Sequence, residues 1–180
     1  AAIGQGDNEF SPLQMAKYVS MLANGGKKIS PTVIKTIRNA DGSEVSKEEM
    51  KAFVKNKLGL QDEDQEDISI NQANLKAVLQ GMKSVTSDTG GTAYVRFKDF
   101  KISVGGKTGS AEAGDKVNAW FVGFAPFENP EIAIVVMVEN GGHGNYTAEV
   151  VRDIMEEYFG MNTQNVEEDM TAKPYIQIMN

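Results

Sequence analysis

The sequence predicts an α+β fold in which helices pack against one β-sheet, and the order of its segments leads to this class. Three segments with apolar residues at helical spacing come first, followed by three strand-like segments and one final helical segment. Helices and strands in separate blocks, without a regular alternation, are typical of α+β domains. The chain has 180 residues and a hydrophobic content of 41%, so it is long enough to bury a real core.

The first helical segment has both a start and a stop signal. Ser11 can cap a helix, a proline follows at the first helical position, and Gln14 can reach back to the cap residue. We therefore expect a helix over residues 12–23. Residues 24–26 read Asn-Gly-Gly, which favours the left-handed backbone that ends a helix.

Two connecting segments frame the second helix. Residues 29–38 are expected to be extended and to turn at residues 41–42 toward a short returning segment. Residues 61–67 (QDEDQED) carry five carboxylates, which could suggest a metal site. Calcium loops need a glycine turn between their ligands, and this segment has none. We therefore interpret it as a solvated loop.

The second and third helices each have a capping residue and an apolar face. Ser46 and Glu49 repeat the capping pattern, and the second helix is expected to end before Gly59. Its buried face is expected to comprise Met50, Phe53 and Val54. Asn71 opens the third helix, so the pattern Ser69-Ile70-Asn71 is interpreted as a helix cap. The core residues of this helix are expected to be Ala73, Leu75, Val78, Leu79, Met82 and Val85.

The strands are expected over residues 100–106, 118–124 and 132–139. The third of these is a continuous apolar run, which is typical of a strand covered on both faces.

The last helix is expected over residues 147–158. Its inward side chains are expected to be Val150, Val151, Ile154, Met155 and Tyr158. His143 lies among glycines before this helix and is interpreted as an exposed loop residue without a catalytic role.

Composition excludes several classes of function. The net charge is −7 and no run of lysine or arginine stands out, so no nucleic-acid partner is expected. The chain has no cysteine, which excludes disulfides, thiolate zinc sites and cysteine nucleophiles. No apolar run approaches the roughly 20 residues of a membrane span, and the chain begins without methionine or a signal-like segment. We therefore expect an excised piece of a larger protein, whose compartment the composition leaves open.

The stretch GGKTGS, residues 105–110, could belong to a phosphate-binding loop or to a site for a peptide carboxylate. A phosphate loop needs a glycine six residues before its lysine, and position 101 is Lys101. It also needs a helix directly after the lysine, whereas Gly114-Asp115 indicates a turn between strands. The phosphate interpretation fails on spacing and on context.

The alternative is a wall of an acyl-transfer site at the end of an edge strand, because serine enzymes that recognise penicillins carry a Lys-Thr-Gly triplet. Lys107 would supply a fixed cation for a substrate carboxylate and for proton movement at a nearby hydroxyl. Thr108 would donate a hydrogen bond to the same carboxylate, and Gly109 would leave room for the substrate. The backbone amide of Ser110 could face the developing oxyanion, a contact worth ~3 to 4 kcal/mol of barrier.

The segments around this triplet make it specific. They are residues 3–6, 11–16, 23–26, 81–85, 91–93, 106–112 and 119–126. In this order they resemble the C-terminal half of the transpeptidase domain of monofunctional (class B) penicillin-binding proteins. The resemblance covers about residues 3–160, and residues 161–180 are expected to be a tail. Trp120 and Phe121 are expected to be core residues of the strand beside the triplet.

The resemblance implies a peptidoglycan D,D-transpeptidase, a membrane-anchored enzyme on the extracytoplasmic face whose anchor lies upstream. It implies that a serine attacks the D-Ala-D-Ala end of a stem peptide, that β-lactams trap the acyl-enzyme, and that no cofactor is needed. The site residues that it implies are Lys107 and Ser110 as catalytic, and Lys107, Thr108, Gly109 and Ser110 as substrate-binding. Glu112 follows in the family pattern and is assigned no chemical role.

Two family motifs are absent from this chain. No serine is followed three residues later by lysine, and Ser69-Ile70-Asn71 comes at the wrong place in the order of motifs. Since a nucleophile and its base act as a unit, the chain alone is expected to be inactive. The alternatives are a β-lactamase or β-lactam sensor domain, and a non-catalytic interaction domain on the same scaffold.

The resemblance also implies a five-stranded antiparallel sheet, of which this chain holds only the last three strands. The apolar strand at 132–138 would then lack a neighbour, and an open apolar edge recruits other strands. We expect strand-mediated self-association, strand exchange, or cover by a local segment such as the tail.

Overall fold

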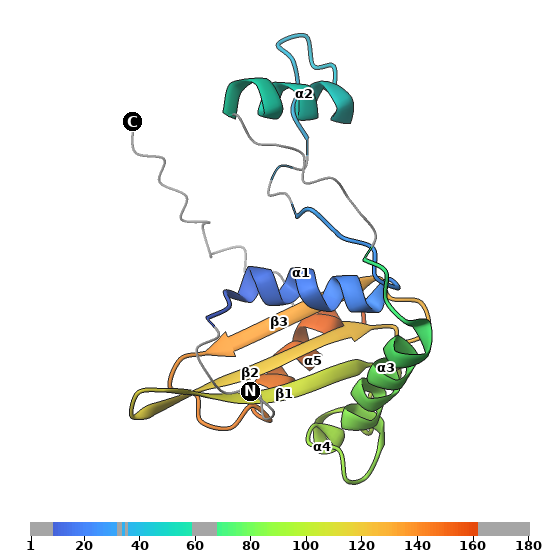
Figure 1. Cartoon of the computed structure of the whole chain (residues 1–180), viewed down its shortest axis with the longest axis vertical. Helices are drawn as coiled ribbons and strands as arrows, with labels where there is room; N and C mark the ends of the chain where they lie inside the picture. The colour runs from blue at the N-terminus through green and yellow to red at the C-terminus, as the bar shows by residue number, and fades with distance from the viewer. Residues whose placement is uncertain (1–8, 32–33, 35, 59–67, 162–180) are drawn as a thin grey trace, which may run out of the picture.

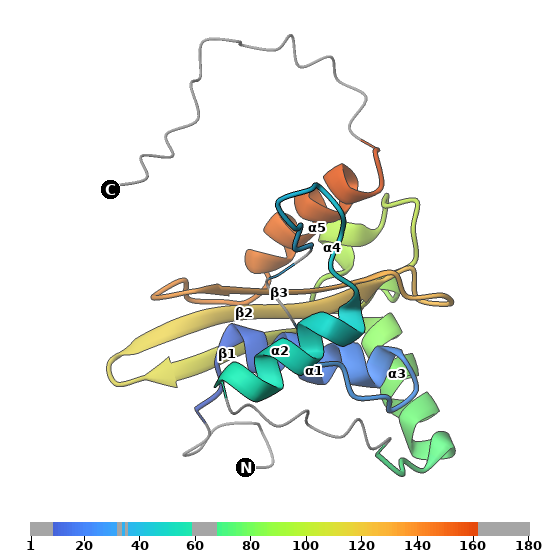
Figure 2. The same cartoon turned by 90° about the horizontal axis from the view of Figure 1, so that it is seen from above.

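The chain forms a three-stranded sheet between two layers of helices. In a computed structural model, which describes residues 9–31, 34, 36–58 and 68–161, the sheet lies between α1 and α3 on one face and α4 and α5 on the other (Figures 1 and 2). The elements are α1 (Pro12–Ala23), α2 (Lys47–Leu58), α3 (Gln72–Ser87), α4 (Tyr94–Phe97), β1 (Gly105–Ala113), β2 (Lys116–Ala125), β3 (Ile132–Val138) and α5 (Thr147–Tyr158). The predicted α+β class is confirmed.

The sheet is antiparallel with the order β1-β2-β3. β1 and β2 form a hairpin whose last pair is Ala113 with Lys116, and Gly114 has the positive φ of 65° that such a two-residue turn requires. β3 pairs with β2 from Ile132 opposite Ala125 to Val138 opposite Ala119. Within the described part of the chain, β1 and β3 are therefore the two edges of the sheet.

Strand alternation divides the core into two clusters, one on each face of the sheet. Phe121 and Ile134 face α4 and α5, where they pack with Phe97, Val151 and Met155. Val122 and Phe124 face the opposite way and pack with Val19 and Met82 of α1 and α3. Successive side chains of a strand point to opposite faces, so β2 supplies both clusters. β3 also contributes to both clusters, as its sequence predicts, although Ile134 is its only residue in the buried class.

The predicted helix starts are confirmed. Ser11 and Gln14 form a complete capping box at α1, with Ser11 N donating to Gln14 Oε1 at 2.8 Å. Asn71 caps α3 through its Oδ1, which accepts from the amides of Ala73 and Asn74. Ser46 and Glu49 also bond reciprocally at the start of α2. The sequence Ser69-Ile70-Asn71 is thus part of a helix cap, as expected.

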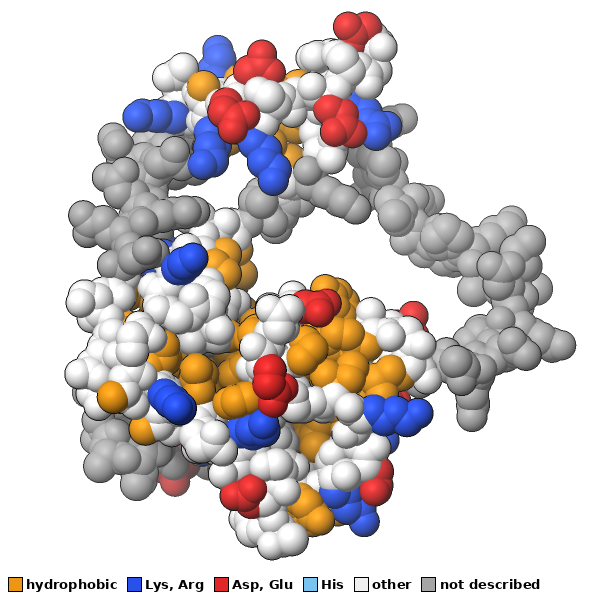
Figure 3. Space-filling view, turned by 90° about the vertical axis from the view of Figure 1, so that its right-hand side faces the viewer, with side chains coloured by type: hydrophobic (Ala, Val, Ile, Leu, Met, Phe, Trp, Pro, Cys, Tyr) orange, Lys and Arg blue, Asp and Glu red, His pale blue; other side chains and the backbone are white. Residues whose placement is uncertain are grey.

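The predicted buried face of α2 is wrong. Phe53 is 59% exposed, Met50 and Val54 are half-buried, and no residue of α2 with a described side chain is fully buried. In Figure 1 this helix lies apart from the sheet, and Figure 3 shows mainly charged side chains in that upper region. No described residue of α2 belongs to either core cluster. The predicted turn before this helix is confirmed, because Asn39 N donates to the carbonyl oxygen of Ser43 at 2.9 Å and a single β-bridge joins Arg38 and Glu44.

Three further expectations about the core need correction. Val78 and Ala73 of α3 are exposed, because the sheet covers only the face that carries Leu75 and Met82. The first strand begins at Gly105 and not at residue 100. In α5 the buried residues are Thr147, Ala148, Val151 and Met155, whereas Val150, Ile154 and Tyr158 are 41% to 53% exposed. The acidic segment 61–67 and the tail beyond residue 161 lie outside the described residues.

Candidate active-site wall on strand β1

β1 carries the four predicted site residues side by side near its start. Lys107 and Ser110 are exposed, and Thr108 and Gly109 are half-buried. Because side chains alternate along a strand, Thr108 and Ser110 point to one side and Lys107 to the other. The residues thus lie on an edge strand, neither in a helix nor in the packed interior. The prediction that they end the strand is wrong, because β1 continues to Ala113.

The two hydroxyl side chains of this wall both have neighbours behind them. Thr108 Oγ1 lies 2.8 Å from Thr92 Oγ1 in the loop before α4. Ser110 Oγ accepts a long hydrogen bond of 3.4 Å from the amide of Gly144, in the loop between β3 and α5. Two loops that are distant in sequence therefore hold the motif from the same side.

Lys107 provides a positive charge without an opposing carboxylate. Its Nζ donates to the carbonyl oxygen of Thr108 at 2.5 Å, and it forms no ion pair with any residue that the structure describes. β1 thus carries an exposed cation on one face and two hydroxyl groups on the other, and both kinds of group can donate hydrogen bonds to an anion such as a carboxylate.

Close backbone packing surrounds Gly109. A β-carbon at Gly109 would lie 3.2 Å from Cβ of Trp120, its partner on β2. Gly144 packs against the backbone of the same residue pair. A β-carbon at Gly144 would lie only 2.5 Å from the carbonyl oxygen of Trp120. Phe121 is fully buried, as predicted, whereas Trp120 is only half-buried. These contacts leave no room for a side chain at Gly144, where the loop between β3 and α5 packs against the backbone of β1 and β2.

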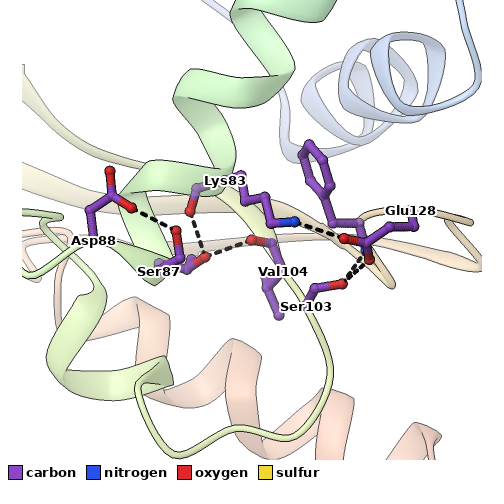
Figure 4. Close-up of polar contacts among 8 residues, drawn as sticks. Lys83, Ser87, Asp88, Ser103, Val104 and Glu128 are labelled. Carbon is purple, nitrogen blue, oxygen red and sulfur yellow. Dashed lines mark hydrogen bonds and ion pairs between the residues drawn. The ribbon is translucent and has the colours of Figure 1, made fainter.

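The segment that leads into β1 is tied to the end of α3. The buried hydroxyl of Thr86 donates to the carbonyl oxygen of Val104 at 2.6 Å. Glu128, in the loop after β2, accepts from Lys83 Nζ at 2.7 Å and from the hydroxyl of Ser103 (Figure 4). These two hydrogen bonds, with that from Lys83 the stronger, lower the pKa of Glu128 to about 2.

Sequence reasoning missed these supporting residues. Thr86, Ser103 and Glu128 carry no motif, because their partners lie 18 to 45 positions away in the chain. Gly144 could have been noticed, since four residues in a row that include three glycines indicate an unusual backbone path. Thr92 belongs to one of the segments used for the resemblance, but its contact with Thr108 is visible only in the structure.

Other kinds of site find little support in the described residues. They contain no group of three or more histidine, cysteine, aspartate or glutamate side chains that could hold a metal ion. His143 is exposed, as predicted. A hollow of about 280 Å³ lies between α1, α3 and Phe127, away from β1. β1 continues past Lys107 and Thr108 to Ala113, so the helix that a phosphate loop needs directly after its lysine is not formed here. None of the described helices combines the length and the apolar character that a membrane span requires.

Comparisons with known proteins point to one family. The model of the penicillin-binding protein transpeptidase domain matches residues 1–156. Penicillin-binding protein H of Bacillus subtilis is 37% identical over 151 residues, which cover 76% of this chain and 19% of that protein. The peptidoglycan D,D-transpeptidase MrdA of Haemophilus influenzae is 30% identical over 183 residues, which cover 92% of this chain and 26% of that protein.

Solved structures agree with these relatives. A crystal structure of Pseudomonas aeruginosa PBP2 in complex with WCK 5153 is similar with a TM-score of 0.64 and 33% identity, over 87% of this chain and 31% of that chain. An imipenem acyl-enzyme complex of penicillin-binding protein A from M. tuberculosis has a TM-score of 0.64 and 25% identity, over 88% of this chain and 33% of that chain. The chain spans about a fifth to a quarter of the length of the curated relatives it matches.

The family match covers most of the chain, and the sheet with its flanking helices is similar in fold to transpeptidase domains of the same family. The chain belongs to the transpeptidase domain family of the class B penicillin-binding proteins.

Proposed function

We propose that this chain provides one wall of the acyl-transfer site of a peptidoglycan D,D-transpeptidase. The nucleophilic serine and its lysine would come from a part of the protein outside this sequence, because no serine here is followed three residues later by lysine. The serine attacks the carbonyl carbon of the D-Ala-D-Ala peptide bond, the C–N bond breaks, and D-alanine leaves with a proton. An amine of a second stem peptide then displaces the serine oxygen.

One observation carries the proposal. β1 presents Lys107, Thr108 and Ser110 along a strand that is an edge of the sheet among the described residues, in a chain of this family. In this role the Lys107 cation attracts the substrate carboxylate and favours removal of the proton from the nucleophile. The hydroxyl groups of Thr108 and Ser110 donate to the carboxylate. Alternate amides of an edge strand point away from its partner, and we assign the amide of Ser110 to the developing oxyanion.

The first experiment uses the protein encoded by the whole reading frame. We expect it to contain a Ser-x-x-Lys motif upstream and to be labelled covalently by fluorescent penicillin. Lys107→Ala should slow labelling by about 100-fold or more, the range of a lost proton-transfer group. Lys101→Ala is the matched control, since Lys101 is also exposed and lies just before β1. Its labelling should be unchanged.

The fate of the acyl-enzyme separates this proposal from its alternatives. A transpeptidase keeps the label for a long time, whereas rapid release with hydrolysed penicillin would indicate a β-lactamase. An intact protein that stays unlabelled, with no upstream Ser-x-x-Lys, would show a non-catalytic interaction domain instead. Labelling of the present chain alone is uninformative here, because a truncated enzyme and a pseudoenzyme would both remain unlabelled.

Partners and location follow from this assignment. The substrates would be D-Ala-D-Ala stem peptides, β-lactams would be inhibitors, and the enzyme would act at the extracytoplasmic face of the membrane. Penicillin-binding protein A from M. tuberculosis, a structural relative, forms acyl-enzymes with imipenem. We also propose that the open apolar edge at β3 leads this chain to associate with itself through strand pairing.

A further inference from the structure

The contact between Thr92 and Thr108 joins two loops at the proposed carboxylate site. Their hydroxyl oxygens lie 2.8 Å apart, and either one could be the donor. Each hydroxyl has one proton and can accept through its lone pairs. When Thr108 donates to an anion, its single proton is used, and the 2.8 Å contact then requires Thr92 to be the donor.

Ser110 also has a hydrogen-bond neighbour behind its hydroxyl, and here the identity of the donor is certain. The amide of Gly144 can only donate, and it donates to Ser110 Oγ at 3.4 Å. This bond occupies a lone pair of Ser110 and leaves its proton free to be given to another group. Ser110 therefore has a donor behind it, and Thr108 has one as well whenever Thr92 is the donor of their contact.

Thr92 is held in place by its backbone neighbours. The amide of Ala93 donates to the carbonyl oxygen of Val85 at 3.0 Å, and Ala93 is fully buried. The amide of Gly91 donates to the carbonyl oxygen of Asp88 at 2.7 Å, and a β-carbon at Gly91 would strike the backbone of α3. The loop is fixed on both sides of Thr92, while the threonine itself is exposed.

We propose that Thr92 is a positioning residue of the carboxylate site, an inference that rests on the proposed function. Its hydroxyl donates to Thr108 Oγ1 and so turns the proton of Thr108 toward the bound carboxylate. Thr92 does not touch the substrate. It acts by removing the alternative orientation in which Thr108 donates backward and meets the anion with a lone pair.

The test compares a free carboxylate with its ester in the intact protein. The rate constant of acylation is measured with benzylpenicillin and with its methyl ester, for the wild type, Thr92→Val and Thr92→Ser. Thr92→Val should slow acylation by benzylpenicillin about 2- to 12-fold, which corresponds to the loss of one ordinary hydrogen bond. The loss should be clearly smaller with the uncharged ester. Thr92→Ser keeps the hydroxyl and should restore the rate with benzylpenicillin.

A double-mutant cycle shows whether Thr92 acts through Thr108. In the Thr108→Val background, Thr92→Val should have no further effect on acylation by benzylpenicillin. Thr92→Ala provides a second variant, and thermal unfolding checks that each variant folds.

Three results would overturn the inference. An unchanged rate in Thr92→Val, an equal loss for acid and ester, or additive effects in the cycle would each exclude positioning through Thr108 while leaving the proposed function intact. A wild-type protein that benzylpenicillin fails to acylate would overturn the proposed function and, with it, the role of Thr92.

Discussion

Glu128 is a single side chain that holds three segments together. It lies after β2, and its carboxylate accepts hydrogen bonds from Lys83 of α3 and from Ser103 just before β1. The ammonium group of Lys83 also lies 4.6 Å from the centre of the Phe127 ring. The start of the motif strand therefore depends on an exposed carboxylate being ionised.

This dependence predicts how stability changes with pH. The folded state lowers the pKa of Glu128 from 4.5 to about 2, so the unfolded state binds more protons between these values. The stabilisation is fully present above pH 4.5 and is lost as the pH falls toward 2. Glu128→Gln should lower the urea midpoint at pH 7, and its difference from the wild type should shrink below pH 4.

The matched control for this experiment is Glu131→Gln. Glu131 is exposed in the same loop, and its side chain forms no ion pair with the described residues. Its urea midpoint should follow the wild type at every pH. An equal drop in both variants at pH 7 would mean that loop charge in general, and not the contact with Lys83 and Ser103, supports the fold.

A substitution at Gly144 is predicted to lower the stability of the fold. A β-carbon there would press on the backbone of Gly109 and Trp120, which cannot move without shifting the sheet. Gly144→Ala should therefore destabilise the fold by about 1 to 3 kcal/mol, as overpacking of a core does. Chemical denaturation measures this difference.

Gly81→Ala is the contrasting substitution. Gly81 lies inside α3, and outside the adjacent backbone of its own helix a β-carbon would meet no heavy atom within 4 Å. Alanine is the better helix former, so this variant should gain about 0.5 to 1 kcal/mol. A loss of stability in Gly81→Ala, or none in Gly144→Ala, would contradict the packing described at these two glycines.

At the scale of elements, the sequence predicted helices better than the faces that they bury. The bounds of the first and last helices were predicted to the residue, because Ser11 with Gln14 and the glycines around both segments mark their ends. The start of β1 was missed by five residues. Residues 102–104 carry Ile-Ser-Val, which favours a strand by composition. Here, however, the carbonyl oxygen of Val104 accepts from the Thr86 side chain of α3, and that of Ser103 accepts from the amide of Phe127.

The buried face of α5 could not be predicted from its sequence. At 100° per residue, these five side chains (Val150, Val151, Ile154, Met155 and Tyr158) span an arc of about 140°. This arc is wider than an apolar stripe of about 100°, so more than one rotation would bury a similar apolar area. Thr147 and Ala148 decide the orientation, and neither is strongly hydrophobic. The hydroxyl of Thr147 is buried and donates to the carbonyl oxygen of Gly144 at 2.6 Å.

Two neighbouring residues of α5 test this orientation. Met155 is fully buried between the sheet and α4, whereas Ile154 is 41% exposed. Met155→Ala should cost about 2 to 5 kcal/mol, the range for deleting a large core side chain. Ile154→Ala should cost less than about 1 kcal/mol, because its lost contacts are partly offset by the helix propensity of alanine. Equal losses in the two unfolding curves would place the helix in a different rotation.

At the scale of the whole molecule, the two edges of the sheet differ in character. The β1 edge carries Lys107, Ser110 and Glu112 as exposed polar side chains, and charged or polar side chains discourage pairing with a foreign strand. The β3 edge is entirely apolar in sequence, and Val138 is 42% exposed. An added strand is therefore expected at β3, which leaves the motif on β1 open.

Self-association through β3 can be measured on the chain itself. Sedimentation equilibrium should show a dimer that dissociates on dilution. Val138→Lys places a charge at the edge and should raise the dimer dissociation constant by at least tenfold. Val95→Lys is the matched control, because Val95 is 71% exposed on α4 and lies away from the strand edge. Its dissociation constant should equal that of the wild type.

If the wild-type chain is a monomer at all concentrations, the β3 edge could already be covered by its own chain, and sedimentation equilibrium can test this too. If residues 162–180 pair with β3 in their own chain, the edge is already covered and the wild type has no reason to associate. A variant that ends at residue 161 would then become a dimer, and Val138→Lys would return it to a monomer. If the shortened chain also remains a monomer, the apolar edge of β3 does not recruit strands, and the proposed self-association is wrong.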